Sequence, residues 1–506
     1  MKKGRIAIIS PNMNGVKDGI NRIQPGHNVG IFAAILKEKG YDVFFRDTAL
    51  EGYHNQTIQS DGVTITIGET NEQIASWLSK VNPDYLIITI LFSNLASHAW
   101  NTARISKKVN PECIVVVGGN HVSNAISDYL YYQSHPHKNY RNGTKFLESG
   151  NIDFAMWGEC DYVLPEFIEK YSNKEDFSRI FGLAYFKDGE YLINPKPHPP
   201  MNLSELPMED RSIFNMEAYF KIGKFHSSKG DKRVGVILAS RGCPEKCTFC
   251  TTPILFGAPV RWRSPIKVYE EIKMLKEEYK VREIQFDDDT LTANRKWLME
   301  LCKLIKPLNL RWCTPNGIKI NYYANNPGLQ REMFKTMSDS GCYQVTFGVE
   351  SGVQEVLDKI IHKNIDLSVV KPTIQAAKEA GMLVHCFYIV GFPGETKEQM
   401  EQTVKFAAES GSDSFSLAIF SPLPGTPLYH EIEEKSLWWN PDYKPEHTLY
   451  TRSLVKVDGF SSKEEFEQWV DENNRYLNNL LKIKDPKRFA LKYGINTSEV
   501  HLKKQT

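Results

Sequence analysis

The 506-residue sequence has no long hydrophobic run, and its charges nearly cancel. Its most apolar segments, such as residues 85–92, are far shorter than the roughly 20 residues that a membrane-spanning helix needs. The sequence contains 62 basic and 61 acidic residues, so the composition does not indicate a broad basic surface for nucleic acid. Residues 1–10 have a basic start but too short an apolar run for a signal peptide. We therefore expect a cytoplasmic protein without membrane or nucleic-acid partners.

A disulfide framework is also not indicated. The nine cysteines are an odd number in a long chain, and three of them lie within eight consecutive residues. The other six are scattered, several of them in apolar strands where a thiol packs as a small hydrophobic group. No G-x-G-x-x-G follows the first predicted strand, which disfavours a nicotinamide dinucleotide. The scattered cysteines are Cys113, Cys160, Cys302, Cys313, Cys342 and Cys386.

Residues 1–172 alternate between strand and helix patterns. Apolar strands separated by helices predict a parallel sheet covered on both faces, here a five-stranded doubly wound domain. Ligands of such sheets bind beyond the carboxyl ends of the strands. The predicted strands cover residues 5–10, 42–47, 85–92, 113–117 and 154–157, and the predicted helices cover 28–39, 71–81, 95–109 and 164–171.

A second βα series begins near residue 233. Six βα units are too few for a closed eight-stranded barrel, so they predict a partial (βα)6 barrel with its reacting groups at the carboxyl ends of the strands. The predicted strands cover 234–239, 283–287, 310–314, 343–348, 383–390 and 414–420, and the predicted helices cover 266–279, 296–305, 367–380 and 397–409.

The two series are joined by a predicted hairpin and a proline-rich linker. Residues 183–186 and 191–193 flank Lys-Asp-Gly-Glu, a hairpin signal, and four prolines follow within residues 195–200. The chain ends in a charged region whose best helix covers 462–481. The predicted domains are therefore residues 1–175, 176–232, 233–440 and 441–506.

Three cysteines form the most specific motif. Cys243, Cys247 and Cys250 are spaced C-x3-C-x2-C directly after the first predicted barrel strand. Three thiolates on one loop hold three irons of a [4Fe–4S] cluster and leave the fourth iron open for a substrate. The alternative is a structural zinc ion, which normally takes four protein ligands with paired spacing, and no second Cys or His pair is evident nearby. The spacing therefore favours the cluster.

This motif resembles that of the radical S-adenosylmethionine (SAM) superfamily, in which the open iron binds SAM's amino and carboxylate groups. The resemblance implies that Phe249 packs near SAM's adenine. It also implies that Asp287, Asp288 and Asp289 replace a Gly-Gly-Glu motif, with acidic groups that accept hydrogen bonds from SAM's ammonium. A solvated loop or helix cap is the alternative. Alternation along a strand puts Asp287 and Asp289 on one face and Asp288 on the other.

Two later strand ends carry the resemblance further. Residues 348–352 resemble the superfamily's G-V-E-S-G segment, which implies that Glu350 lies near SAM or a neighbouring cofactor; a helix cap is the alternative, especially for Ser351. Residues 390–396 resemble the segment near SAM's adenine, and Gly391 lets the backbone approach a ligand closely. Their alternative is a plain strand-to-helix turn.

A doubly wound domain before a radical SAM barrel resembles the cobalamin-binding subfamily. No D-x-H-x-x-G is present, so the resemblance implies a cobalt whose lower face lacks that motif's histidine. A domain that binds nothing, or binds substrate, is the alternative. The resemblance assigns cobalamin contacts to Ser93, Asn94, Gly118, Gly119, His121, Gly158 and Glu159.

Residues 47–53 and 92–94 extend the resemblance to class B radical SAM methyltransferases. That class implies methylation of an unactivated carbon of a small molecule through a 5′-deoxyadenosyl radical and methylcobalamin, with a flavodoxin- or ferredoxin-type reductant. One alternative is a dehydratase, cyclase or epimerase without methyl transfer, in which Cys302, Cys313, Cys342 or Cys386 donates hydrogen. Another is a non-enzymatic cluster or cobalamin sensor, which the acidic residues at the barrel loops argue against. The pattern identifies no catalytic residue.

Overall fold

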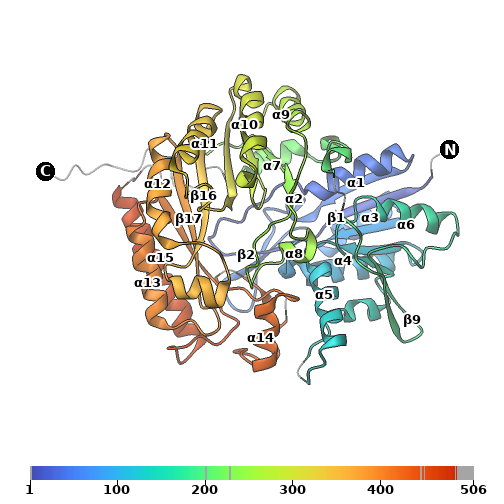
Figure 1. Ribbon diagram of the computed structural model, residues 1–506. Helices are drawn as coiled ribbons and strands as arrows, with labels where there is room; N and C mark the ends of the chain where they lie inside the picture. The colour runs from blue at the N-terminus through green and yellow to red at the C-terminus, as the bar shows by residue number, and fades with distance from the viewer. Residues whose placement is uncertain are drawn as a thin grey trace.

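The two large sheets of the chain are mainly parallel and lie side by side, each covered by helices (Figure 1). The N-terminal sheet occupies one side of the molecule and the six-stranded barrel sheet the other. This mixed α/β architecture confirms the predicted fold class. The computed structural model describes residues 3–138, 140–199, 202–226, 230–444, 447–449, 451–484 and 486.

Five parallel strands form the centre of the N-terminal sheet. They are β1 (Arg5–Ser10), β3 (Asp42–Asp47), β6 (Tyr85–Thr89), β7 (Ile114–Gly118) and β8 (Phe154–Met156). Their order, β3-β1-β6-β7-β8, is the 2-1-3-4-5 order of one common doubly wound fold. The central strands β1, β6 and β7 are almost wholly buried because helices cover both faces.

The helices of this half agree with the predicted pattern except at two places. A capping box at Thr70 explains why α3 begins where the sequence predicts. The sequence analysis missed the short α2 and also α5, whose polar residues Ser123, Asn124 and Asp128 are buried and blur the apolar period. The helices are α1 (His27–Glu38), α2 (Thr48–Glu51), α3 (Asn71–Val81), α4 (Ala96–Val109), α5 (Asn120–Ser134) and α6 (Val163–Ser172).

The predicted hairpin does not stand apart as a linker. Its strands, β9 (Leu183–Lys187) and β10 (Glu190–Ile193), extend the first sheet to seven strands, and β9 pairs antiparallel with β8. Pairing covers the backbone of a strand that would otherwise be an open edge. A separate three-stranded sheet, which the sequence analysis did not anticipate, contains β2 (Met13–Val16), β4 (Gln56–Ile58) and β5 (Thr64–Ile67).

The second sheet has the six parallel strands of the predicted partial barrel, in chain order. Each strand lies within a few residues of its predicted position. The strands are β11 (Val234–Ile237), β14 (Glu283–Phe286), β15 (Arg311–Ile318), β16 (Cys342–Glu350), β17 (Leu383–Val390) and β18 (Ser414–Ile419). The helices around them are α9 (Pro265–Tyr279), α10 (Arg295–Ile305), α11 (Pro327–Asp339), α12 (Val370–Glu379) and α13 (Lys397–Glu409).

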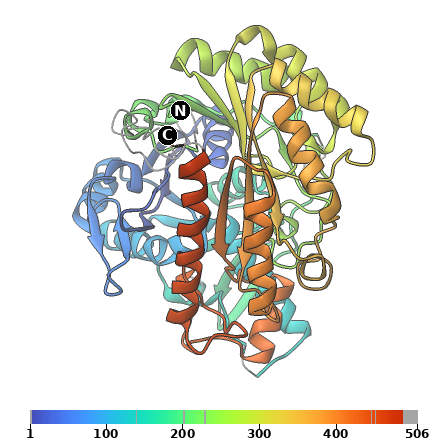
Figure 2. The same cartoon turned by 90° about the vertical axis from the view of Figure 1, so that its left-hand side faces the viewer.

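The last strand of the barrel is covered by the long helix α15 (Lys463–Lys484), which runs beside α13 in Figure 2. Asn474 Nδ2 donates to the Leu417 carbonyl of β18. The rest of the predicted C-terminal region, beyond residue 486, lies outside the described residues, as does Pro200 of the predicted linker. Two shorter helices, α7 (Met216–Ile222) and α14 (Pro427–Lys435), flank the barrel strands in the sequence.

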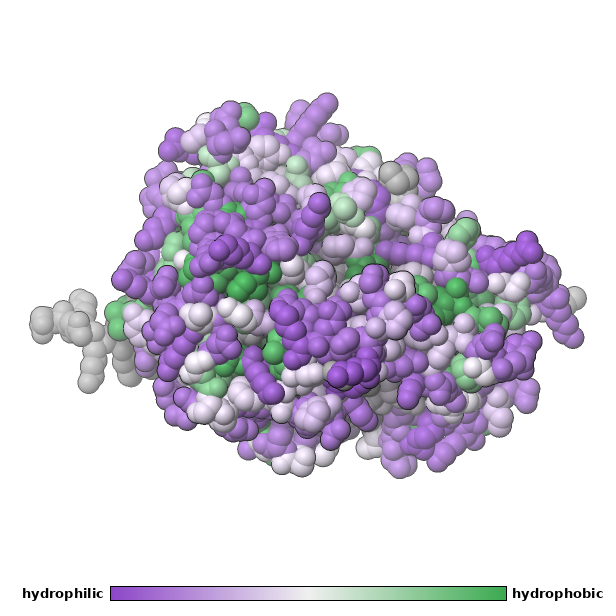
Figure 3. All heavy atoms as spheres, turned by 60° about the horizontal axis from the view of Figure 1, so that its bottom comes forward, coloured by the Kyte–Doolittle hydropathy of each residue, from purple (hydrophilic) through white to green (hydrophobic). Residues whose placement is uncertain are grey.

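On the face drawn in Figure 3, hydrophilic residues predominate and hydrophobic ones form separate patches. Within the described parts of the chain, no helix is both long enough and apolar enough to cross a membrane.

Candidate active site

The three motif cysteines lie on a loop closed by two short strands. β12 (Ser240–Arg241) pairs antiparallel with β13 (Arg261–Trp262), so residues 242–260 form a hairpin loop at the carboxyl end of β11. Gly242 has a φ of +98°, and a Cβ there would lie 2.3 Å from the Pro259 carbonyl oxygen. Only glycine fits this position without rearrangement of the loop. The loop is therefore shaped by its backbone before any cluster binds.

The three thiols share one partly buried space. Burial, with a smaller contribution from the charge of Cys250, raises the pKa of Cys243 to about 11 and that of Cys247 to about 12. Burial also raises the pKa of Cys250, whose Sγ lies 3.4 Å from Thr252 Oγ1. Three thiols this close need cations to hold them as thiolates, and iron of a cluster supplies that charge. The donor set fits a [4Fe–4S] cluster.

A structural zinc ion is the alternative to the cluster. Across the described residues, no three His, Cys, Asp or Glu side chains converge as the ligands of one metal ion do. Cluster cysteines bind different irons and need not converge on a single point.

The three consecutive aspartates have three different environments. Asp287 accepts a hydrogen bond from Gln24 Nε2 at 2.6 Å and lies 3.2 Å from His27 Nε2, both from the N-terminal half. Asp288 is buried, and it accepts hydrogen bonds from Ser240 Oγ and from the backbone N–H of Ala239. Burial raises the pKa of Asp288 to about 7, although these hydrogen bonds act in the opposite direction. Asp287 and Asp288 thus hold neighbouring segments in place.

Asp289 is the member of the run that faces the cysteines. It is exposed to solvent, although protein atoms surround much of it. Partial loss of water raises the pKa of Asp289 to about 6, and its charge reaches the thiols of Cys243 and Cys250. Of the three carboxylates, it is the one available to a ligand beside the cysteine loop.

Glu350 and Ser351 point to different partners. Glu350 ends β16 with a φ of +68°, and its Oε1 lies 2.6 Å from Lys363 Nζ. Ser351 is fully buried; its Oγ lies 3.1 Å from Thr403 Oγ1 and accepts from the Val353 backbone N–H. Ser351 therefore organises the turn after β16, and Glu350 lies toward the cysteine loop, where its charge acts on Cys247.

Phe249 and Gly391 lie in one neighbourhood. The ring of Phe249 lies 5.8 Å from that of Phe392, the residue after Gly391. Glu395 is fully buried and accepts hydrogen bonds from the backbone N–H groups of Gly391 and Phe392, while burial raises its pKa to about 7. This carboxylate fixes the glycine turn at the end of β17.

The predicted cobalamin loops of the first sheet lie at its carboxyl edge. His121 is buried, and its Nδ1 lies 3.1 Å from Ser93 Oγ. Gly119 packs on Ile90, just beyond the end of β6, because a Cβ there would lie 2.6 Å from the Ile90 carbonyl oxygen. Nearby, Phe92 is 61% exposed, so this edge presents an apolar side chain. The Asn94 carbonyl accepts from Asn14 Nδ2.

His121 and Asn120 belong to the first turn of α5 rather than to a loop, and Gly118 is the last residue of β7.

The next strand end is tied to the barrel. Gly158 N–H donates to Ser123 Oγ. Glu159 is buried and lies 2.8 Å from Arg241 NH1, and it also pairs with Arg261. Asp161 accepts two hydrogen bonds from Arg241, at 2.7 and 3.1 Å. Arg241 and Arg261 are paired across β12 and β13. The carboxylates of Glu159 and Asp161 therefore bind the base of the cysteine hairpin.

A short helix of the cysteine loop makes the second contact between the halves. α8 (Thr252–Leu255) packs against α5 of the first domain, and Figure 1 shows them adjacent. The carboxyl ends of both sheets therefore meet around the cysteine loop.

The sequence analysis missed several charged residues of this region. Arg241 stands directly before Gly242 and Cys243, and that position is a signal that could have marked it. Lys363, Lys319 and His27 are distant from every motif and carry no local signal. Lys319, just beyond β15, pairs with Glu245 inside the cysteine loop.

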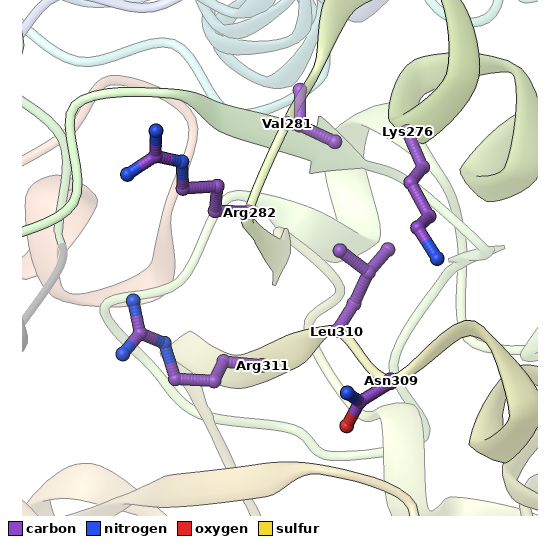
Figure 4. A pocket seen from close by; sticks show the side chains of 6 residues that line it. All are labelled: Lys276, Val281, Arg282, Asn309, Leu310 and Arg311. Atoms are coloured by element: carbon purple, nitrogen blue, oxygen red, sulfur yellow. The ribbon is translucent and has the colours of Figure 1, made fainter.

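The hollow in Figure 4 is not part of this site. Its lining residues precede or begin β14 and β15, at the amino ends of the strands, whereas barrel chemistry occurs at the carboxyl ends. Arg311 pairs with Asp231, and Lys276 donates to the Leu308 carbonyl. The lining residues are Lys276, Val281, Arg282, Asn309, Leu310 and Arg311.

A three-cysteine loop after the first strand of a six-stranded partial barrel defines the radical SAM class of enzyme. Residues 237–407 match the family model described as the radical SAM superfamily. The chain thus contains a radical SAM domain and is a radical SAM enzyme, whose family implies a [4Fe–4S] cluster and SAM.

Relatives match most of the chain. Cytidylyl-2-hydroxyethylphosphonate methyltransferase of Streptomyces wedmorensis is 28% identical and covers 94% of this chain and 90% of its own. Anaerobic magnesium-protoporphyrin IX monomethyl ester cyclase of Rubrivivax gelatinosus is 27% identical and covers 85% of this chain and 70% of its own.

A solved structure supports the fold. The radical SAM methyltransferase TsrM of Kitasatospora setae, with cobalamin and a [4Fe–4S] cluster bound, superimposes with a TM-score of 0.64. It is 16% identical and covers 86% of this chain and 78% of that one.

Proposed function

We propose that this protein is a cobalamin-dependent radical SAM enzyme that methylates an unactivated carbon of a small-molecule substrate. The observation that carries the proposal is the meeting of the two sheets at their carboxyl ends. Glu159 and Asp161 of the first sheet bind Arg241, two residues before Cys243. A methyl carrier on the first domain and SAM on the barrel would therefore face one substrate space.

The names of the relatives agree with this function. The Streptomyces wedmorensis relative is a methyltransferase, and its similarity to this chain extends over 90% of its own length. TsrM, which shares the fold, is a methyltransferase whose structure holds cobalamin and the cluster.

Different residues of the chain bind the cluster and the different parts of SAM. Cys243, Cys247 and Cys250 hold the cluster, and Asp289 accepts hydrogen bonds from SAM's ammonium. Phe249 and the turn at Gly391 border the adenine. When bound, the cluster supplies the electron that cleaves SAM reductively, and cobalamin supplies the methyl group.

The carboxyl edge of the first domain would hold a large cofactor without a histidine ligand from a D-x-H-x-x-G motif. Gly118, the last residue of β7, has no side chain to keep a ligand from the backbone, and Phe92 offers an apolar surface at the same edge. His121 is buried and bonded to Ser93, so it is not offered to cobalt. Ser93, Asn94, Gly118, Gly119 and Gly158 frame this edge, and Glu159 acts through Arg241 instead.

The test is anaerobic reconstitution of the full chain with cluster and hydroxocobalamin, followed by SAM and a strong reductant. We expect both 5′-deoxyadenosine and S-adenosylhomocysteine by mass spectrometry, and loss of 5′-deoxyadenosine in Cys247→Ala. Release of 5′-deoxyadenosine without S-adenosylhomocysteine would remove methyl transfer and keep the radical chemistry. We also propose a flavodoxin- or ferredoxin-type protein as the physiological reductant.

A second candidate is a radical SAM reaction without methyl transfer. The similarity to the Rubrivivax gelatinosus cyclase favours it. A hydrogen-donating cysteine is not supported, because Cys302, Cys313, Cys342 and Cys386 are all at most 2% exposed. The product analysis above separates the two candidates.

A further inference from the structure

A buried lysine lies beside the cysteine loop, and none of the roles described above uses it. Lys363 follows the π-helical turn η7 (Val356–Ile361), and 12% of its side chain is exposed. Its Nζ lies 2.6 Å from Glu350 Oε1, and Glu350 is 8% exposed. A buried ion pair of this kind is costly to desolvate, so its presence calls for a role beyond stability.

The backbone around the pair is adapted to it. Glu350 adopts a left-handed φ of +68° at an irregularity of β16, a conformation that is strained for a non-glycine residue. A Cβ at Gly348 would lie 2.7 Å from Glu350 Oε1 and 2.9 Å from Lys363 Nζ, so a side chain there would displace the pair. Strained, over-determined residues of this kind cluster at functional sites.

The same turn is fastened to the cysteine loop. Thr248, next to Cys247, donates its backbone N–H to the Ile361 carbonyl at 3.0 Å and its hydroxyl to the Ile360 carbonyl at 2.6 Å. Burial acts to lower the pKa of Lys363, but Glu350, Cys247 and Cys250 raise it, so the ammonium keeps its charge. Two of the three cluster cysteines therefore lie within the electrostatic reach of this cation.

We propose that the Lys363 ammonium raises the reduction potential of the cluster held by Cys243, Cys247 and Cys250, with Glu350 as its opposing counter-charge. Reduction adds one electron to the cluster and no proton to the protein, and Lys363 remains protonated throughout. A nearby cation stabilises the more negative, reduced cluster. The proposal rests on the cluster assignment and is independent of cobalamin and of methyl transfer.

The experiment is an anaerobic potentiometric titration of the full chain with reconstituted cluster, without SAM or cobalamin, followed by electron paramagnetic resonance. Lys363→Met should disfavour reduction about tenfold, which is a fall of about 59 mV for a one-electron couple. Glu350→Gln removes the opposing charge and should shift the potential upward. Lys363→Arg keeps the charge and should stay within about threefold of the parent.

Shifts of opposite sign in the reduction potentials of Lys363→Met and Glu350→Gln indicate an electrostatic effect. A disturbance of the fold has no reason to move the two potentials in opposite directions. Lys319→Met is the matched control, since it breaks a second lysine–glutamate pair beside the cysteine loop, and a smaller shift is expected. An unchanged potential in Lys363→Met, or a shift as large in Lys319→Met, overturns the proposal. If Lys363→Met binds no cluster, Glu350→Gln decides alone, and a downward shift there refutes it.

Discussion

At the scale of single residues, the three consecutive aspartates at positions 287–289 make different contacts and have different roles. Asp288 holds the segment before the cysteine loop through Ser240, and Asp287 binds two residues of the first domain. Asp289 is left facing the cysteines. A run of three identical side chains thus contains one ligand-facing carboxylate and two that support its surroundings.

We expect Asp289→Asn to weaken SAM binding by at least tenfold while iron content stays unchanged. Hydrogen bonds to a charged group contribute about 1.5–3 kcal/mol, and tenfold corresponds to about 1.4 kcal/mol. The measurement is a SAM titration of the reconstituted protein, read from the cluster's paramagnetic spectrum. Asp287→Asn is the control, and an equal loss of affinity in that variant would show that Asp289 is not the SAM carboxylate.

At the scale of elements, the cysteine hairpin depends on one glycine. Gly242→Ala places a Cβ 2.3 Å from a backbone oxygen at a φ of +98°, and backbone does not yield as a flexible side chain does. We expect the variant to fold but to hold less than half of the parent's iron and sulfide per chain, measured by chemical analysis after reconstitution.

Gly257→Ala is the matched control in the same loop. Its φ is +77°, but the added methyl group would lie 3.8 Å from its nearest neighbour, Pro259 Cδ, so this variant carries the backbone strain without the collision. Near-normal iron content is expected. Equal loss in both variants would mean that conformational strain, and not the contact with the Pro259 carbonyl, limits cluster binding.

Most barrel elements could be predicted because each carries a local signal. β17 and α13 occur at the predicted residues, with a period-2 burial pattern in the strand and a capping box at Thr396 of the helix. The pairing of the hairpin β9–β10 with the edge of the first sheet could not be predicted, since its sequence does not reveal which strand it joins. The sequence pattern also could not predict the contact between Asp287 and His27, because 260 positions separate them and only tertiary folding brings them together.

At the scale of the whole molecule, a buried charge network joins the two halves. Asp161→Asn leaves Arg241 short of a partner in a buried position, and breaking a buried pair costs about 3–5 kcal/mol. We expect a lower unfolding temperature and faster hydrogen exchange in residues 242–260, because Arg241 anchors the hairpin base. Mass spectrometry of exchanged peptides locates the effect.

Glu217→Gln provides the control for that experiment. It removes an ion pair with Arg233 in which the glutamate is well exposed, and exposed pairs contribute about 0–1 kcal/mol. Little change in stability is expected. If Asp161→Asn were equally mild, the network would not hold the halves together.

His27 joins the halves through a further, pH-dependent contact. It lies between Glu209 of the linker, at 2.8 Å, and Asp287 of the barrel. Burial alone would lower the pKa of His27, but the two carboxylates raise it to about 10. An unfolded histidine titrates near pH 6.5. Because the folded pKa is the higher one, the stabilisation is present in full below about pH 6.5 and is lost as pH rises through about 10.

His27→Gln should therefore lower the unfolding temperature strongly at pH 6 and much less at pH 10.5. Thermal melts of the parent and the variant across this range measure the difference at each pH. His54→Gln, at an exposed histidine, should show no such trend. A difference that stays constant with pH would mean that His27 acts through its shape, as a neutral spacer between the domains, and that its charge contributes nothing to their union.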